Sequence, residues 1–289
     1  MNEVDLEKKK LQRAILMIAK DAIALCEKYN IKYFINGGTL LGAIRHEGFI
    51  PWDDDFDIGM RRLDYEKFIN ICKSELDPEK YFVQTEYTER YYAFAFGKIQ
   101  LKNTCILEEF SKNVPIQHGI FIDIFPYDNI PDNRVKRTFF LLINQIFKNL
   151  LWIKCGYGEE IHKKKISYKC LLIISHLFSI EKLKKIRRDL LNQYNNISTE
   201  KCISSDYPKE ILDNKWFANL VKYKFEDFEF FGFENYESYL KYLYGDFMKI
   251  PSKSEQVTHT NSEIDFGPYD QVMEDEINGS FDKIKDSSM

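Results

Sequence analysis

The first thirty residues carry apolar side chains at every third or fourth position: Leu11, Ile15, Ile18, Ala22, Leu25 and Tyr29. This spacing is the period of an amphipathic helix, which we expect to end near Asn30. The period then changes, and residues 31–37 are expected to form a short strand that stops at Gly37 and Gly38. A helix is expected directly behind the glycines, at 39–46. The pattern therefore predicts a strand, a Gly-Gly turn and a helix in succession.

A two-residue period follows at 55–58, where two aspartates alternate with Phe56 and Ile58. Such alternation is typical of a strand with one face on the core. Beyond it we expect one helix, at 63–76, and three strands rich in aromatic and β-branched residues, at 81–87, 92–107 and 118–128. The last strand is expected to end in a turn that contains Asp128. The first 130 residues therefore have an α/β pattern.

The middle of the chain contains two strongly apolar helical stretches, 137–152 and 168–180, which are joined by a lysine-rich connector. Both are shorter than the roughly 18 apolar residues that a membrane-spanning helix needs. One interpretation is a helical hairpin that packs on the core. The other is a hairpin with its apolar face in lipid and its lysines at the headgroups, which implies peripheral association with the inner face of the plasma membrane.

The final third is expected to contain a strand at 224–233 and a helix at 236–245. This pattern divides the chain into four parts: an α/β core at 1–130, a helical insertion at 131–200, a part at 201–275 that completes the same domain, and a loose tail at 276–289.

Composition limits the classes of function. The chain has 289 residues, of which 44% are hydrophobic, and 41 basic against 45 acidic side chains give a formal net charge of -4. This balance supplies no overall positive field and argues against nucleic acid as a partner. The six cysteines are scattered without a CxxC pair, and the N-terminus lacks the apolar stretch of a secretory signal. We therefore expect reduced thiols and a cytoplasmic location.

The aspartates of 55–58 are the strongest chemical signal. On a strand, Asp55 and Asp57 point to the same side, so two carboxylates would lie side by side. A divalent cation between them would relieve their repulsion, and hard oxygen ligands favour Mg²⁺ or Mn²⁺. Asp53 and Asp54 either take a direct part in this site or form a solvated turn.

Gly37 and Gly38 supply a complementary feature. A glycine turn lets the backbone approach a phosphate, and the first amides of the helix, at Thr39 and Leu40, would point at it with the positive end of the helix dipole. A Gly-Gly pair alone can simply make a tight turn. The acidic pair that follows in the sequence favours the phosphate site.

Three runs of the sequence together resemble a known family: YFINGGTLLGAIRHEGFIPWDDDFDIGMRRLDYEKF at 33–68, HGIFIDIFPYD at 118–128 and YLYGDFMKIP at 242–251. They resemble the signature of the LicD family of phosphocholine transferases, which includes the fukutin-related proteins and belongs to the nucleotidyltransferase fold superfamily. The resemblance covers about residues 10–260. It implies an α+β fold with a nucleotidyltransferase-like mixed sheet flanked by helices, a helical insertion, and a C-terminal region of helix and strand.

The resemblance also implies roles for single residues. Asp123 is expected to join Asp55 and Asp57 in holding the metal or in orienting the attacking hydroxyl group. The alternative is a carboxylate that caps a turn before Pro126. Lys98 is expected to contact the nucleotide phosphates, and its alternative is a solvated lysine on a strand.

Three further residues near these motifs are candidates for substrate binding. Arg45 would hold a diphosphate or pair with the aspartates. Trp52 would stack on a base or close a corner of the chain. His259 resembles the histidine that follows the C-terminal motif in the family. Phe247 replaces a tyrosine that is common in the family, which removes one hydroxyl group.

The resemblance implies a metal-assisted phosphoryl transfer. The donor would be a CDP-activated alcohol, typically CDP-choline, and CMP would leave. The acceptor would be a hydroxyl group of a glycan precursor, such as teichoic acid, lipopolysaccharide or capsule. One alternative is a nucleotidyltransferase that moves a nucleotide to a protein or a small molecule. Another is a non-catalytic, membrane-docked partner in glycan assembly, but this would require a lost catalytic acid and none is lost.

Overall fold

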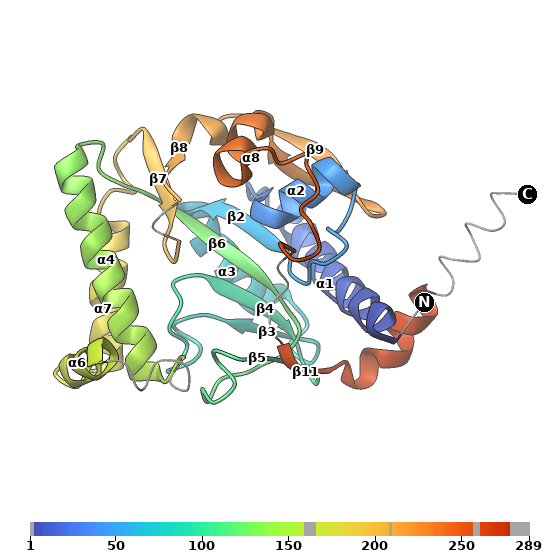
Figure 1. Ribbon diagram of the computed structural model, residues 1–289, viewed down its shortest axis with the longest axis horizontal. Helices are drawn as coiled ribbons and strands as arrows, with labels where there is room; N and C mark the ends of the chain where they lie inside the picture. The colour runs from blue at the N-terminus through green and yellow to red at the C-terminus, as the bar shows by residue number, and fades with distance from the viewer. Residues whose placement is uncertain (1–2, 159–165, 208–209, 257–260, 278–289) are drawn as a thin grey trace, which may run out of the picture.

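The centre of the molecule is a mixed sheet flanked by helices (Figure 1). This computed structural model describes residues 3–158, 166–207, 210–256 and 261–277. The strand order is β1-β2-β6-β4-β3, and β7 and β8 continue the sheet from the far end of β6. The strands are β1 (Phe34–Ile35), β2 (Asp57–Arg61), β3 (Tyr81–Gln84), β4 (Gly97–Leu101), β6 (Phe121–Asn129), β7 (Lys201–Ser204) and β8 (Leu212–Asp213).

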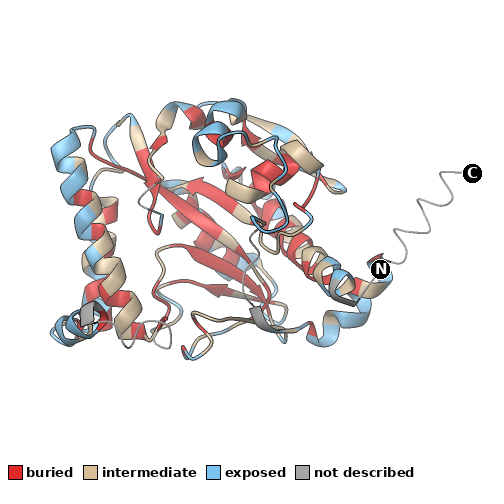
Figure 2. Ribbon diagram, viewed as in Figure 1, coloured by how far each residue is buried: buried red, intermediate tan, exposed pale blue. Residues whose placement is uncertain are grey.

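β2 and β6 run parallel, and the other neighbouring strands of this sheet run antiparallel. Figure 2 shows that buried residues follow β2, β6 and β4 through the middle of the molecule. The predicted fold class, an α+β fold with a nucleotidyltransferase-like mixed sheet and flanking helices, is therefore confirmed.

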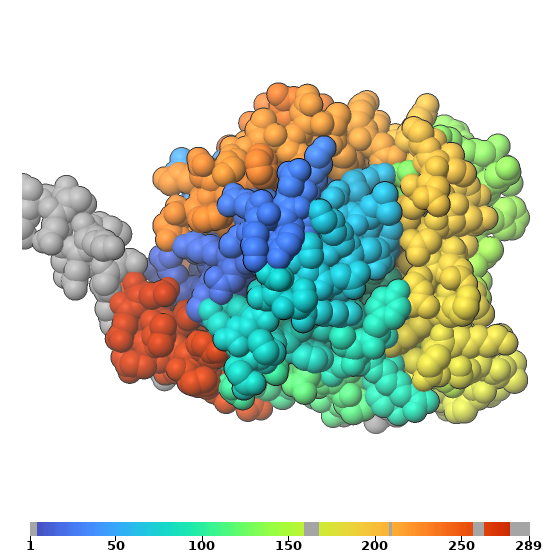
Figure 3. All heavy atoms as spheres, turned by 180° about the vertical axis from the view of Figure 1, so that it is seen from behind, coloured from blue at the N-terminus to red at the C-terminus, as the bar shows by residue number. Residues whose placement is uncertain are grey.

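Helices α1 (Glu3–Lys28) and α3 (Arg62–Glu75) pack against each other and against the sheet. The apolar stripe predicted along α1 is buried, since Leu11, Ile15 and Ile18 are at most 1% exposed. These residues share one core with the apolar side chains of β2, β4 and β6. Seen from behind, α3 forms the middle of the surface (Figure 3).

A second group of elements lies beside β1: α2 (Gly37–His46), the hairpin of β9 (Leu220–Phe225) and β10 (Phe228–Phe233), and α8 (Tyr236–Tyr244). The prediction of a single strand at 224–233 is wrong. The chain turns at Glu226, which has a φ of 56°, and the two halves pair with each other. The hairpin is fixed by its aromatic residues, because Phe225 and Phe230 are fully buried against Phe56.

The described part of the insertion forms three helices: α4 (Arg134–Cys155), α6 (Ile166–Ser175) and α7 (Ile180–Asn192). α4 and α6 are the predicted pair, whereas α7 is not predicted. α4 packs against both of the others. The polar residues that interrupt α4 have a structural reason, since Asn144 is buried and binds the carbonyl oxygen of Ser205 and the guanidinium of Arg187. Among the described helices, none combines the length and the apolar character of a membrane span.

The C-terminal part contributes a strand to a separate two-stranded sheet. β11 (Asn261–Asp265) pairs with β5 (Cys105–Glu108), so the predicted strand at 92–107 is in fact β4 and β5 with a turn between them. The short 3-10 helices are η1 (Asn214–Phe217) and η2 (Gly267–Tyr269). Residues 270–277 are helical, and Ile277 is buried. The packed chain therefore extends past the predicted start of the tail, whose remainder lies outside the described residues.

A buried ion pair joins α3 to β6. The prediction that Asp128 lies in a turn is wrong, because it belongs to β6 and is fully buried. Arg62 donates to both of its carboxylate oxygens, over 2.6 and 2.8 Å. Ser205 and Asn195 donate to the same carboxylate. A buried charge is tolerated when its hydrogen bonds are satisfied in this way, so Asp128 stabilises the fold.

Candidate active site

A row of polar side chains crosses one face of the sheet. Asp57 of β2 lies opposite Asp123 of β6. Asp123 in turn lies opposite Lys98 of β4, and Lys98 lies opposite Gln84 of β3. Residues paired in this way project to the same face. The structure therefore brings Asp57 and Asp123 together, as the resemblance implies.

Two buried residues set the direction of Asp55 and Asp57. Phe56 and Ile58 are fully buried, so the alternation turns the two aspartates to the opposite side. Both aspartates line the same cavity, so they lie on one side, as the sequence predicts.

Asp55 does not lie on the predicted strand, because β2 begins only at Asp57. The segment before the strand is held by α1, where the side-chain amide of Gln12 donates to the carbonyl oxygen of Asp53 over 2.9 Å. Asp55 therefore belongs to the loop that leads into β2.

The two glycines open α2 rather than precede it. The sequence predicts a helix from Thr39, but α2 begins at Gly37, whose φ of 53° is in the left-handed region. A Cβ atom on Gly37 would lie 3.3 Å from Oδ2 of Asp57. A Cβ atom on Gly38 would lie 2.9 Å from Oδ2 of Asp53. Only glycine lets the start of the helix approach the carboxylates this closely.

Two hydrogen bonds fix this arrangement. The hydroxyl of Thr39 accepts the N–H of Asp57 over 2.8 Å, which ties α2 to β2. The N–H of Gly37 donates to the hydroxyl of Tyr239 over 2.9 Å, which ties α2 to α8. The side chain of Thr39 is therefore a structural link, and its predicted backbone contact with phosphate stays a prediction.

The pKa of Asp57 is raised well above its ordinary value. The largest cause is burial. The pKa is raised further by the negative charges of Asp55, Asp123 and Asp53, and it is lowered by Lys98. The charged carboxylates therefore destabilise one another. A bound cation would remove this repulsion.

The oxygen donors fit a magnesium ion whose coordination is completed by substrate. Within the part of the chain that the structure describes, no three His, Cys, Asp or Glu side chains already form a metal-binding group. Mg²⁺ commonly takes one or two carboxylates from a protein and its other oxygens from phosphates and water. Asp55 and Asp57 can supply these carboxylates, and Asp123 adjoins them.

Lys98 is not a solvated lysine, because its side chain is only 6% exposed. Its Nζ lies 3.4 Å from Oδ1 of Asp123, 3.5 Å from Oε2 of Glu108 and 3.1 Å from the ring centre of Phe121. Asp123 lies within β6, so it does not cap a turn. Neither Lys98 nor Asp123 is among the described residues that line the cavity. The contact of Lys98 with phosphates thus stays a prediction.

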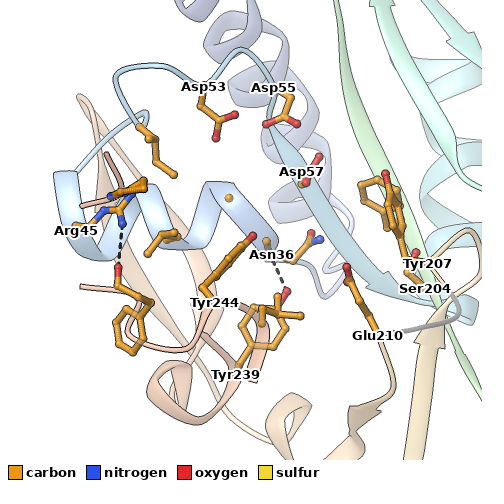
Figure 4. Close-up of a pocket in the computed structure, with 18 of the residues that line it drawn as sticks. Asn36, Arg45, Asp53, Asp55, Asp57, Ser204, Tyr207, Glu210, Tyr239 and Tyr244 are labelled. Carbon is orange, nitrogen blue, oxygen red and sulfur yellow. Dashed lines mark hydrogen bonds between the residues drawn. The ribbon is translucent and has the colours of Figure 1, made fainter. Parts of the chain in front are cut away.

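A cavity of about 510 Å³ opens beside Asp57 (Figure 4). Its size is typical of a site for a small molecule. Its wall comes from α2, the loop before β2, β6, β7 with the segment after it, and α8 with the turn that follows. The predicted site residues in this wall are Gly37, Gly38, Arg45, Trp52, Asp55 and Asp57.

Arg45 and Trp52 lie together in the wall. The guanidinium of Arg45 lies 5.7 Å from the ring of Trp52. It donates to the carbonyl oxygen of Phe247 over 2.9 Å and to that of Lys249 over 3.4 Å. Its Nε donates to Nε2 of His46 over 2.9 Å. Arg45 thus connects α2 to the C-terminal motif at the wall of the cavity.

The C-terminal motif forms one wall of the cavity. Asp246, Phe247 and Pro251 line it. Phe247 contacts Arg45 through its carbonyl oxygen and packs its ring edge to face against Tyr236, so the missing hydroxyl group takes no part in the contact with Arg45. His259 lies outside the described residues.

Other lining residues are not predicted from the sequence: Asn36, Ser204, Tyr207, Glu210, Tyr239 and Tyr244. Asn36 and Tyr244 lie inside recognised motifs, which could have indicated them. The others come from segments without a motif, and 15% of the chain is aromatic, so composition could not distinguish them.

The fold and the site define a nucleotidyltransferase-like protein, with carboxylates on two neighbouring strands set against a glycine-initiated helix. Residues 30–149 match the model of the LicD/FKTN/FKRP nucleotidyltransferase domain. The chain is 33% identical over 247 residues to the lipopolysaccharide cholinephosphotransferase LicD of Haemophilus influenzae. The match covers 82% of this chain and 89% of that protein. Over 48 residues it is 42% identical to the human ribitol 5-phosphate transferase FKRP, covering 17% of this chain and 10% of that protein. The chain belongs to the LicD family.

Proposed function

We propose that this protein is a metal-dependent phosphotransferase that moves phosphocholine from CDP-choline to a hydroxyl group of a glycan precursor and releases CMP. The observation that carries the proposal is the half-buried Asp57, which lies opposite Asp123, is close enough to Asp55 for that charge to raise its pKa, and lies against the glycine start of α2. The similarity to a lipopolysaccharide cholinephosphotransferase over most of both chains supports phosphocholine as the transferred group and a glycan as the acceptor.

The diphosphate of the donor would bind at the N-terminus of α2. Backbone N–H groups and the helix dipole stabilise phosphate oxygens at such a place, and Gly37 and Gly38 leave room for them. Arg45 would donate to a phosphate oxygen, and Trp52 would stack on the cytosine.

Asp55 and Asp57, with Asp123 beside them, would hold Mg²⁺ or Mn²⁺. A bound ion of this kind neutralises charge on a diphosphate. The raised pKa of Asp57, caused by burial and by neighbouring carboxylates, supports a site that is completed by a cation.

In the reaction, the acceptor oxygen forms a bond to the phosphorus that carries the choline group, and the bond from that phosphorus to the CMP oxygen breaks. The acceptor hydroxyl loses its proton to a base. Asp123 is our candidate for this base, since it adjoins Asp57 and is positioned by Lys98.

We further propose that α4 holds the protein at the inner face of the plasma membrane. Its outer side carries an exposed apolar stripe: Val135, Phe139, Leu142, Ile143 and Ile146. Figure 2 shows exposed residues along this helix. The basic residues Arg134 and Lys136 are also exposed and border the stripe. Apolar side chains between basic ones suit a surface of anionic lipid.

The direct test is phosphorus NMR of the protein with CDP-choline, Mg²⁺ and a lipopolysaccharide or teichoic acid acceptor. We expect CMP and a new phosphodiester signal on the acceptor. Transfer of a nucleotide from CTP or ATP, with CDP-choline left intact, would replace this proposal with the nucleotidyltransferase alternative.

A further inference from the structure

One end of the cavity is lined by three tyrosines and a carboxylate. We call it the tyrosine–glutamate end and define it as Tyr207, Glu210, Tyr239 and Tyr244. Figure 4 shows Tyr207 and Glu210 on the side of the aspartates away from Arg45, and the rings of Tyr239 and Tyr244 below the aspartates. The mechanism proposed above gives these side chains no role.

Among the residues that the structure describes, no charged side chain balances the carboxylate of Glu210. Burial raises its pKa. Within the described residues, no side chain pairs with it. Lys148 lies 5.8 Å from the ring centre of Tyr207 and donates to the carbonyl oxygen of Asp206. A partly buried carboxylate without a partner is unfavourable in the free protein. This indicates that a bound ligand supplies the counter-charge.

Two more polar atoms lie in this wall without a hydrogen-bond partner among the described residues. They are Oδ1 of Asn36 and Oγ of Ser204, in residues that are 6% and 2% exposed. Both residues line the cavity. Buried polar atoms are rarely left unsatisfied, so they support a ligand at the same place.

The tyrosine–glutamate end adjoins the carboxylates. A Cβ atom on Gly37 would lie 3.7 Å from the hydroxyl oxygen of Tyr244 and 3.3 Å from Oδ2 of Asp57. The hydroxyl and the carboxylate therefore flank one point at the start of α2. In a phosphorylated amino alcohol such as choline phosphate, only two carbon atoms separate the ammonium from the ester oxygen. A phosphate beside Gly37 would thus place the ammonium within reach of this end.

We propose that the tyrosine–glutamate end binds the cationic head of an amino alcohol carried by the donor, with Glu210 as counter-charge and the tyrosine rings as aromatic contacts. This inference rests on the proposed function. A neutral polyol such as glycerol or ribitol would leave the charge of Glu210 without a partner, so the same end disfavours those donors.

The test is calorimetric binding of four compounds to the full chain with Mg²⁺: CDP, CDP-choline, CDP-ethanolamine and CDP-glycerol. We expect the protein to bind a cationic donor about tenfold more tightly than CDP-glycerol. Glu210→Gln should remove most of this preference and leave the binding of CDP unchanged. The matched control is Glu255→Gln, a second glutamate of the cavity wall, which should keep the preference.

Tyr207→Phe and Tyr207→Ala separate the ring from its hydroxyl group. The ring attracts a cation without the hydroxyl, so the phenylalanine variant should keep the preference and the alanine variant should weaken it. CDP-ethanolamine identifies the kind of cation, because a primary ammonium donates hydrogen bonds and should lose affinity in Tyr207→Phe.

The outcomes are distinguishable. An unchanged preference in Glu210→Gln, with CDP still bound, would overturn this inference and leave the proposed function standing. Tighter binding of CDP-glycerol than of either cationic donor would overturn this inference and also phosphocholine as the transferred group, and would leave only a CDP-alcohol donor standing. If the wild-type protein binds none of the four compounds, both the inference and the proposed function are wrong.

Discussion

Gly37 and Gly156 show how the site segment, residues 33–68, differs from the helical insertion. Both glycines have positive φ angles, of 53° and 90°. A Cβ atom on Gly37 would lie 3.3 Å from a carboxylate oxygen of Asp57, whereas one on Gly156 would meet nothing within 4 Å. Gly156 serves only the end of α4, but Gly37 also serves the chemistry beside it. In the insertion, glycine is therefore required by backbone geometry alone. In the site segment, it also leaves room beside a carboxylate for a ligand.

Buried charge differs between the two regions in the same way. Asp206, which anchors the insertion, is paired with Arg187 over 2.8 Å, and both side chains are at most 3% exposed. Asp57 is surrounded mainly by other carboxylates, which raise its pKa after burial itself has done so. A balanced buried charge stabilises the fold, and an unbalanced one indicates function.

The largest effect is expected for Asp57→Asn. The substitution removes the central carboxylate, so we expect transfer to fall by about a thousandfold or more. The pKa of Asp57 is raised in the folded state, so wild-type stability falls as pH rises from the unfolded pKa toward the folded one. At neutral pH, without metal, the variant should therefore unfold at the same or a higher temperature, as measured by circular dichroism.

The control for this variant is Asp54→Asn. Asp54 is a neighbour in sequence but is not among the described residues of the cavity wall. Its activity should stay within about threefold of the wild type. Equal losses in the two variants would contradict a specific role for Asp57.

Arg187→Met is expected to have the largest effect on stability. It leaves Asp206 buried without its partner, which should cost about 3–5 kcal/mol in the free energy of unfolding by urea. Below its unfolding transition the variant should keep the wild-type KM for the donor. The double variant with Asp206→Asn should recover part of the stability. A loss of donor binding without a loss of stability would show that the helical insertion takes part in donor binding and is not functionally independent of the site segment.

Gly37→Ala and Gly156→Ala form a matched pair. Each should lose about 1 kcal/mol of stability, because alanine is strained at positive φ. Only Gly37→Ala should also lose activity, by about a hundredfold, because its methyl group meets Asp57. Steady-state kinetics and urea unfolding of both variants check this prediction. Similar kinetics for the two variants would show that Gly37 has no more effect on activity than Gly156.

The smallest effect on the fold is expected for Leu142→Asn on the apolar stripe of α4. The side chain is 54% exposed, so stability should change by less than about 0.5 kcal/mol. Co-sedimentation with vesicles that contain phosphatidylglycerol should fall about tenfold. Thr138→Asn, at an exposed polar position of the same helix, is the control and should sediment like the wild type. Unchanged sedimentation of both variants would contradict the membrane proposal.

The sequence predicts the local part of the site because its chemistry is concentrated in one short segment. The turn of Gly37 and Gly38 and the alternation around Phe56 depend on near neighbours, so pattern and spacing suffice. Glu210 and Tyr239 could not be predicted, because only tertiary packing brings them to α2. The hairpin of β9 and β10 was missed because phenylalanines alternate with polar residues on both sides of Glu226 and Asp227, which together resemble one strand, although the chain turns at Glu226.

Cation-dependent binding of the donor at Asp57 is the property on which the proposed function depends most directly. The decisive measurement is calorimetric titration of CDP-choline into the wild-type protein and into Asp57→Asn, each with Mg²⁺ and with EDTA. We predict binding to the wild-type protein that requires Mg²⁺ and is lost in the variant. Binding that is equally tight in EDTA, or in Asp57→Asn, would contradict the assignment of this site.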